Sequence, residues 1–183
     1  LARKNGVDIG QSTVEEVRAT YQFNDITSFL AVYYPAMDVL QDEDDFHDLA
    51  AAYFERARAN GVVRAECFFD PQAHTSRGIA IETVIRGYHR AVVEAREAGL
   101  SADLILCFLR DMSAESALET LRAALPYKAM FIGVGLDSDE RNNPPTKFAR
   151  VFELAREAGL RITMHCDIDQ VGSIDNIRAA LTE

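Results

Sequence analysis

The sequence is poor in cysteine and in basic residues, and it contains no long apolar run. Its 183 residues carry 19 Lys and Arg against 29 Asp and Glu, a formal net charge of −10. This balance argues against non-specific binding to nucleic acid or to an anionic membrane, because both reward clustered positive charge. Cys67, Cys107 and Cys166 are odd in number, far apart and set in apolar surroundings, which favours buried free thiols over disulfides or a zinc cluster.

No stretch has the features of a membrane span or an export signal. The longest uncharged apolar segments, such as LILCFL at 104–109, fall far short of the roughly 20 residues that cross a bilayer. The opening residues, LARKNGVDIG, have no apolar signal core. With thiols that suit a reducing compartment, these absences lead us to expect a cytoplasmic protein with no membrane partner.

The length is typical of one domain, and 48% hydrophobic residues are enough for a sizeable core. Helical and strand-like periods alternate along the chain. We predict helices over 13–21, 26–40, 43–60, 80–98, 113–125, 144–159 and from Ser173 onward, strands over 62–69, 102–109, 130–137 and 161–167, and a loop over 70–78. In the third helix, we expect one buried face made of Phe46, Leu49, Ala50, Tyr53 and Phe54.

Strands that are apolar on both faces and alternate with helices indicate a parallel sheet in an α/β fold. An open doubly wound sheet would favour a Gly-rich phosphate loop, yet no GxGxxG follows any strand. Polar residues close every strand instead: Asp70, Arg110, Asp137, and His165 with Asp167. Active sites of (β/α)8 barrels lie at that end of the strands, so we favour the barrel. Four strands make about half of one, and we expect residues 1–183 to be a single partial barrel domain of a longer protein.

His165 is the most informative candidate for chemistry. An imidazole at the carboxyl end of a strand, beside acidic residues, can ligate a metal, while a carboxylate serves as a second ligand, a base or a supporting partner. The alternative is a hydrogen-bonded core histidine. Asp167 and Asp169 are two residues apart, and Asp167 shares the face of His165 if the strand continues.

Two further groups are weaker candidates. Asp137, Ser138, Asp139 and Glu140 form an acidic cluster that could equally be a solvated loop capping the next helix. Asp70 and His74 could equally serve a turn, because Asp-Pro is itself a turn signal. His47 and His89 fall within predicted helices, and we assign them no role.

Several segments in register resemble one known family. They are LARKNGVDI, FLAVYYPAMDVL, AECFFDPQAHTSRG, LILCFLRDM, ALPYKAMFIGVGLDSDE and PPTKFARVFELAREAGLRITMHCD. Together they resemble the adenosine/adenine deaminases of the amidohydrolase superfamily, most closely the adenine deaminase branch of bacteria and fungi. The resemblance implies a (β/α)8 barrel with one zinc ion that hydrolyses the 6-amino group of a small-molecule purine and releases ammonia.

The family pattern carries over only in part. Its first two zinc ligands, a His-x-His pair, stand just before a segment like LARKNG, so the resemblance implies that they precede Leu1. His165 occupies the place of the third ligand, the His of a His-Ala-Gly-Glu motif. The Glu of that motif protonates the purine, but Ile168 stands here. The resemblance also implies that Asp137 and Ser138 help to line the purine pocket.

Three hypotheses follow from this pattern. In the first, a zinc-dependent aminopurine deaminase uses Asp167 as a displaced acid; Asp169 is the alternative. In the second, a related amidohydrolase acts on another amino-heterocycle, for which HCDID is an altered specificity motif. In the third, the barrel binds a ligand without deaminating it. A homo-oligomer stays open in all three.

Overall fold

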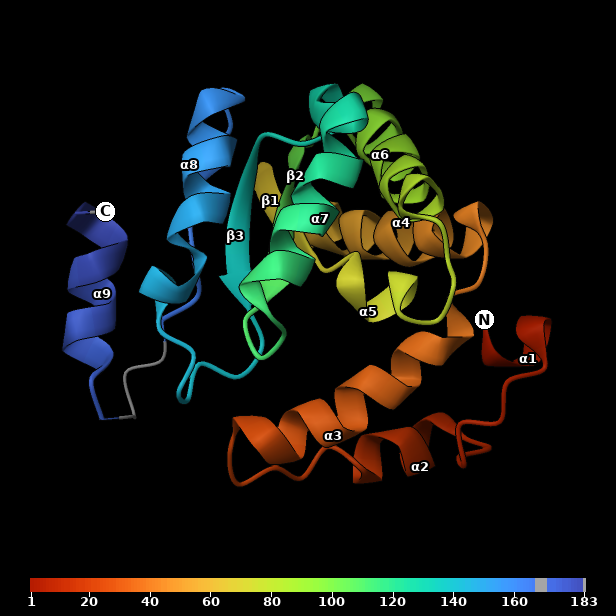
Figure 1. The fold of residues 1–183 in the computed structure, drawn as a ribbon. Helices are drawn as coiled ribbons and strands as arrows, with labels where there is room; N and C mark the ends of the chain where they lie inside the picture. Colours follow the sequence, from red (N-terminus) through yellow and green to blue (C-terminus); the bar gives the residue numbers. More distant parts are fainter. Residues whose placement is uncertain (167–170, 183) are drawn as a thin grey trace.

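The computed structural model describes residues 1–166 and 171–182. Its centre is a four-stranded sheet in the order β1-β2-β3-β4, and every neighbouring pair is parallel (Figure 1). The strands are β1 (Arg64–Phe69), β2 (Ser101–Leu109), β3 (Gly133–Asp137) and β4 (Arg161–Ile162). The predicted parallel arrangement of adjacent strands is therefore confirmed.

The last two strands are shorter than predicted. Residues 125–130 form a 3-10 turn, η2 (Leu125–Met130), with a proline in its first turn, so β3 begins at Gly133. The regular part of β4 ends at Ile162, yet its ladder continues. The Thr163 amide donates to the Val134 carbonyl and the His165 amide to the Leu136 carbonyl, both at 3.0 Å. Pairing with β3 therefore reaches His165.

Four of the described helices begin next to a residue whose side chain caps them. Side chains of Thr13, Asp25, Asp42 and Ser113 each accept a hydrogen bond from a backbone amide of the first turn. The helices are α1 (Ala2–Asn5), α2 (Val14–Ala19), α3 (Ile26–Ala36), α4 (Glu43–Ala59), α5 (Gln72–Thr75), α6 (Ile81–Glu97), α7 (Ala114–Ala124), α8 (Ala149–Glu157) and α9 (Ser173–Thr182), with 3-10 turns η1 (Met37–Val39) and η3 (Pro145–Phe148).

Several helical segments differ from the prediction. The helix expected over 26–40 changes to a 3-10 turn after Ala36, and Pro35, which lacks an amide donor, lies in the last turn of the α-helix. The two prolines at 144–145 open a 3-10 turn rather than an α-helix, and α8 starts at Ala149. The expected loop over 70–78 contains the short helix α5.

The core lies between the sheet and the helices that pack against one of its faces, mainly α4, α6, α7 and α8. The buried face of α4 differs from the predicted one. Leu49 and Tyr53 are exposed, at 40% and 52%, whereas Asp45 and Ala57 are buried beside the predicted phenylalanines and Ala50. The apolar face of α4 is therefore narrower than the sequence pattern indicates.

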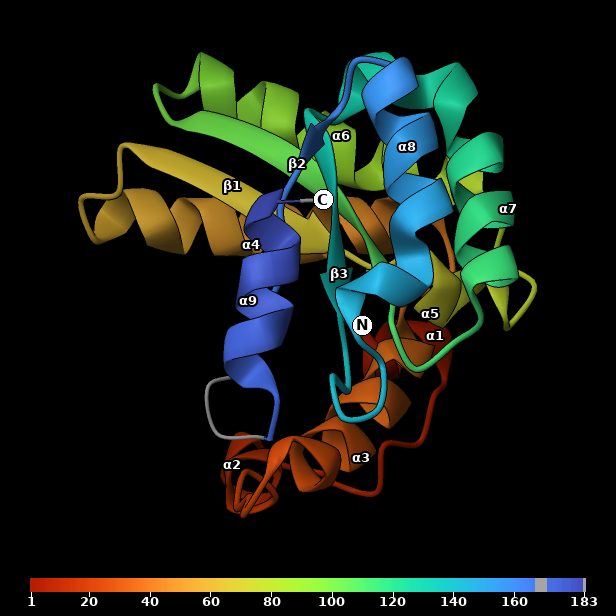
Figure 2. The same cartoon turned by 60° about the vertical axis from the view of Figure 1, so that its left-hand side comes forward.

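The opposite face of the sheet is the one that a closed barrel would enclose. In the described part of the chain, β1 pairs with β2 alone and β4 with β3 alone, so both are edge strands. Phe68 of β1 is 42% exposed. Helices α2 and α3 lie beyond the carboxyl end of β3 in both views (Figures 1 and 2). Two edges and an open inner face are what half of a barrel predicts.

None of the helices among residues 1–166 and 171–182 combines the length and the apolar character needed to cross a bilayer.

Candidate active site at the carboxyl edge of the sheet

Asp137 and His165 stand next to each other at the carboxyl edge of the sheet. Leu109 of β2 is the register partner of Asp137 on one side. On the other side, the His165 amide donates to Leu136, so the ladder brings His165 level with Asp137. Residues level in a parallel pair share a face. The prediction that these two residues lie at the same end of the sheet is confirmed.

Asp137 also belongs to a cluster of three potential ligand groups, which it forms with side chains from β2 and from the end of β1. The carboxylates of Asp70 and Asp137 and the thiol of Cys107 lie within 4.8 Å of one another. Gly135 makes room for this cluster, because a Cβ at that position would lie 2.8 Å from the Cys107 sulfur. The Asp70 Oδ1 atom is buried and has no hydrogen-bond partner in the described part of the chain. A buried acceptor of this kind is expensive unless it is protonated or meets a ligand.

The cluster disfavours negative charge. Burial, with the nearby charges of Asp137 and Asp111, raises the pKa of Asp70 to about 8. Burial and the same kind of acidic neighbours raise the pKa of the Cys107 thiol well above its usual value. Tyr33 of α3 also faces this region, and burial, with the charges of Asp70 and Asp137, raises its pKa to about 12. At neutral pH, Asp70, Cys107 and Tyr33 are therefore mainly protonated.

Ser138 holds the Asp137 carboxylate in place. Its backbone has a φ of 74°, in the left-handed region that non-glycine residues seldom adopt. This turn points the Ser138 amide at Asp137 Oδ1, which accepts its hydrogen bond at 2.8 Å. Burial raises the pKa of Tyr34, and the Ser138 side chain next to it acts in the opposite direction.

The rest of the acidic cluster 137–140 serves the loop. Asp139 pairs with Arg141 at 2.8 Å, as the solvated-loop interpretation predicts. Glu140 is only 4% exposed, and its carboxylate lies 3.5 Å from Arg110, the polar residue that follows β2. Arg110 is fully buried and points away from the Asp70 cluster, toward the backbone that follows β3 and β4.

The histidines have separate roles. His165 has an exposed side chain on the inner face, which stays open in this half of a barrel. His74 does not join Asp70 in a site: its ring packs edge-on against Phe46, and Arg77 approaches its Nδ1 at 3.0 Å. Burial, with a smaller effect of Arg77, lowers the pKa of His74 to about 4. His47 lies on α4, where it contacts Asp48 and Glu94.

The predicted acid Asp167, its alternative Asp169, and Ile168 lie outside the described residues. Sequence reasoning missed Tyr33 as a residue facing the site, and it treated Cys107 only as a free thiol. The free state is confirmed for Cys67, Cys107 and Cys166. The available signal for Cys107 was its position two residues before the last residue of β2, on the face that also carries Asp137 in β3.

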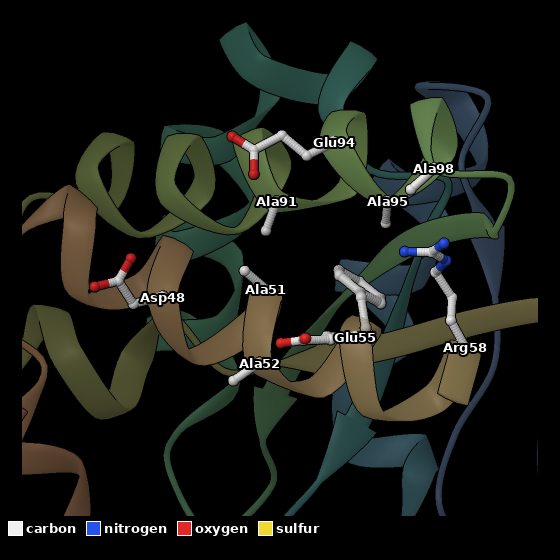
Figure 3. A pocket seen from close by; sticks show the side chains of 10 residues that line it. Asp48, Ala51, Ala52, Glu55, Arg58, Ala91, Glu94, Ala95 and Ala98 are labelled. Carbon is white, nitrogen blue, oxygen red and sulfur yellow. The ribbon is translucent and has the colours of Figure 1, made fainter. Parts of the chain in front are cut away.

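A separate groove of about 480 Å³ lies between α4 and α6, away from the strand ends. Ala51 and Ala91 point toward each other across it, while Asp48, Glu55 and Glu94 stand around it (Figure 3). Small side chains on both helices leave this hollow on the outer, helical side of the molecule. It contributes nothing to the candidate active site.

The fold and this edge define an α/β protein with half of a (β/α)8 barrel, whose strand ends carry a histidine and two neighbouring carboxylates. The chain belongs to the adenosine deaminase family, because the model of that family matches residues 1–183. This confirms the family resemblance found in the sequence.

Solved structures agree with the assignment. The crystal structure of adenine deaminase from Arthrobacter aurescens superimposes with a TM-score of 0.94 at 47% identity, over 99% of this chain and 55% of that chain. An amidohydrolase from Burkholderia ambifaria with bound zinc gives a TM-score of 0.79 at 28% identity, over 100% of this chain and 50% of that one.

Curated relatives are similar along the same length. An uncharacterized deaminase of Schizosaccharomyces pombe is 50% identical over 184 residues, covering 100% of this chain and 54% of the relative. The adenine deaminase of Geotalea uraniireducens is 53% identical over 182 residues, covering 99% and 51%. The chain thus spans about half the length of the relatives it matches.

Proposed function

We propose that the complete protein hydrolyses the exocyclic amino group of an aminopurine, with adenine as the first candidate, and uses one bound zinc ion. The observation that carries the proposal is the placement of His165 level with Asp137 on the inner face, at the carboxyl edge of the sheet. The named activity of similar adenine deaminases supports the choice of substrate. Residues 1–183 would form part of one barrel domain in that protein.

The residues fit a zinc ion. His165 offers an exposed imidazole on the inner face, and nitrogen donors are among those that zinc prefers. Bound zinc would lower the pKa of a water from 15.7 to about 7 and so supply a nucleophile at neutral pH. The zinc bound by the similar Burkholderia amidohydrolase supports the choice of metal.

The remaining roles belong to side chains of this chain. Asp137, held by the Ser138 amide, would line the purine pocket together with Ser138. Water adds at the ring carbon and ammonia leaves, so the adjacent ring nitrogen must receive a proton from a positioned acid. Asp167 is our candidate for that acid. Asp70 is the described alternative, because its carboxyl is protonated at neutral pH and lies beside Asp137.

The test uses the complete protein, its zinc content and its release of ammonia from adenine. His165→Ala should lose zinc and activity together, whereas His89→Ala, a change on α6, should retain both. Asp167→Asn should lower the rate about 10²- to 10⁴-fold with zinc retained. If Asp70→Asn alone has that effect, Asp70 is the acid.

The same measurements separate the competing functions. Zinc without turnover of adenine, but with turnover of another amino-heterocycle, would favour the altered-specificity hypothesis. A protein that binds no zinc and releases no ammonia from any of these compounds would refute the proposal and leave the ligand-binding barrel.

A further inference from the structure

Arg110 is a buried cation whose hydrogen bonds go to the backbone. It follows β2 directly, and its side chain has no exposed surface. Its Nε donates to the Asn143 carbonyl at 3.0 Å, and its Nη1 donates to the His165 carbonyl at 2.9 Å. Glu140 stands 3.5 Å from Nη1 and supplies the opposite charge. One guanidinium thereby connects the segments that follow β2, β3 and β4.

The His165 carbonyl depends on this contact. The ladder holds the His165 amide through Leu136. A continued ladder would offer the Ser138 amide to the His165 carbonyl, but that amide donates to Asp137 Oδ1 instead. The Asp137 carbonyl accepts from the Arg110 amide at 3.0 Å. Arg110 therefore contacts both neighbouring strands at their carboxyl ends: its amide donates to Asp137 at the end of β3, and its guanidinium donates to His165. Both backbone groups of His165 are fixed as a result.

A second cation stiffens the arrangement. Lys147 donates to the Arg110 carbonyl at 2.9 Å and to the Asn143 side chain at 2.8 Å. Lys147 thus ties the backbone of Arg110 to the side chain of Asn143, the residue whose backbone carbonyl accepts from the Arg110 guanidinium. The two residues that contact each other through the guanidinium are therefore also linked through Lys147.

Stability alone explains this arginine poorly. A buried guanidinium loses its hydration, and replacing a buried ion pair with apolar side chains is often neutral or stabilising. The Arg110 Nη2 atom is buried without a partner among residues 1–166 and 171–182, which adds to the cost. What the residue does supply is a planar fork whose Nε and Nη1 reach carbonyls of two separate segments, a geometry that the single nitrogen of a lysine does not match.

We propose that Arg110 is a positioning residue that fixes the backbone of His165 and thereby directs its imidazole toward the metal. The inference rests on the proposed function, in which His165 is a zinc ligand. Removing a group that orients a metal ligand, without binding the metal itself, typically weakens metal affinity about 10- to 100-fold. We expect an effect of that size for Arg110.

The experiment compares three variants of the complete protein. Arg110→Met keeps most of the volume and removes every side-chain donor, whereas Arg110→Lys keeps the charge and loses the planar fork. Gln72→Met is the matched control. Gln72 is a buried polar residue at the same end of β2, and it bonds to the Leu109 amide at 2.9 Å and to Ser116 at 2.7 Å without contacting His165.

Two metal-binding properties are measured: zinc affinity, by chelator competition, and the visible absorption of the Co²⁺ form. The urea midpoint of the metal-free protein measures stability separately. We expect both Arg110 variants to bind zinc about 10- to 100-fold more weakly and to shift the Co²⁺ spectrum. Gln72→Met should lose stability and keep the zinc affinity and spectrum of the wild type.

Wild-type zinc affinity in Arg110→Lys and Arg110→Met would overturn the inference. Equal losses of zinc affinity in Gln72→Met would also overturn it, because the effect would then follow general stability. If Arg110→Met does not fold, Arg110→Lys decides. If neither folds while Gln72→Met does, the role of Arg110 is structural. If the His165→Ala variant binds zinc as tightly as the wild type, the proposed function itself is refuted.

Discussion

Asp70→Asn should make the metal-free protein more stable above about pH 4 and less sensitive to pH. Burial, with the charges of Asp137 and Asp111, raises the pKa of Asp70 from 3.8 to about 8 in the folded state. Between these values the folded protein keeps a proton that the unfolded chain has released. The free energy of unfolding therefore falls as the pH rises through this window, and the loss is complete above the folded pKa.

The expected size of this effect is large. A shift of about four pKa units, at roughly 1.4 kcal/mol each, corresponds to on the order of 5 kcal/mol across the window. An amide cannot ionise, so Asp70→Asn should lose most of this slope.

Urea unfolding between pH 5 and about pH 9, with a chelator present, measures the slope in the complete protein. Asp8→Asn, which removes an exposed carboxylate, is the control and should keep the wild-type slope. The same pH slope in Asp70→Asn and the wild type would refute the reasoning, because it would mean that Asp70 is ionised in the folded protein at neutral pH.

Three further changes test the packing. Burial favours the protonated form of Asp45, but four hydrogen bonds to its carboxylate outweigh burial and lower its pKa to about 2. Asp45→Asn should therefore reduce the free energy of unfolding by about 2 kcal/mol above pH 4. Urea unfolding should show this difference disappearing toward pH 2. Gly135→Ala should cost about 1–3 kcal/mol through contact with Cys107, and adding Cys107→Ala should recover part of it; strict additivity in the double-mutant cycle would contradict this. Gly87→Ala should lower the melting temperature more than Gly135→Ala, because its Cβ would lie 2.5 Å from a backbone carbonyl of α4; an equal or smaller effect would show that the helices separate easily.

The sequence was sufficient for the order and direction of the strands, because each apolar run is followed by a helix that must cross back over the sheet. The same topology predicted that Asp137 and His165 share an edge. The meeting of Asp70 with Cys107 was not predictable in this way. It depends on the register between two strands that are separated by a loop and a long helix, and no local pattern encodes that register.

Three details of the structure differ from the sequence prediction or could not be predicted: the start of β3, the burial of Tyr53 and the direction of the Arg110 side chain. Met130 begins the apolar run of β3, so periodicity placed it in the strand, whereas it is the last residue of a 3-10 turn that has a proline near its start. Tyr53 has the spacing of a buried residue, but its side chain lies outside the buried face of α4 and is exposed. The direction of Arg110 toward backbone carbonyls depends on where three loops meet, which sequence spacing cannot provide.

The register of the short pairing between β3 and β4 decides which side chain of β4 faces the candidate active site. Side chains alternate between the two faces of a strand, so a slip of one residue would turn His165 toward the helices and bring Met164 to the inner face. Gly133 and Gly135 offer no side chains to resist such a slip. Ile162 and Met164, packed against the core, and the ladder bonds of Thr163 and His165 must therefore select the correct alignment. A misaligned β4 would retain a parallel sheet and nearly the whole core while presenting a thioether where the imidazole belongs.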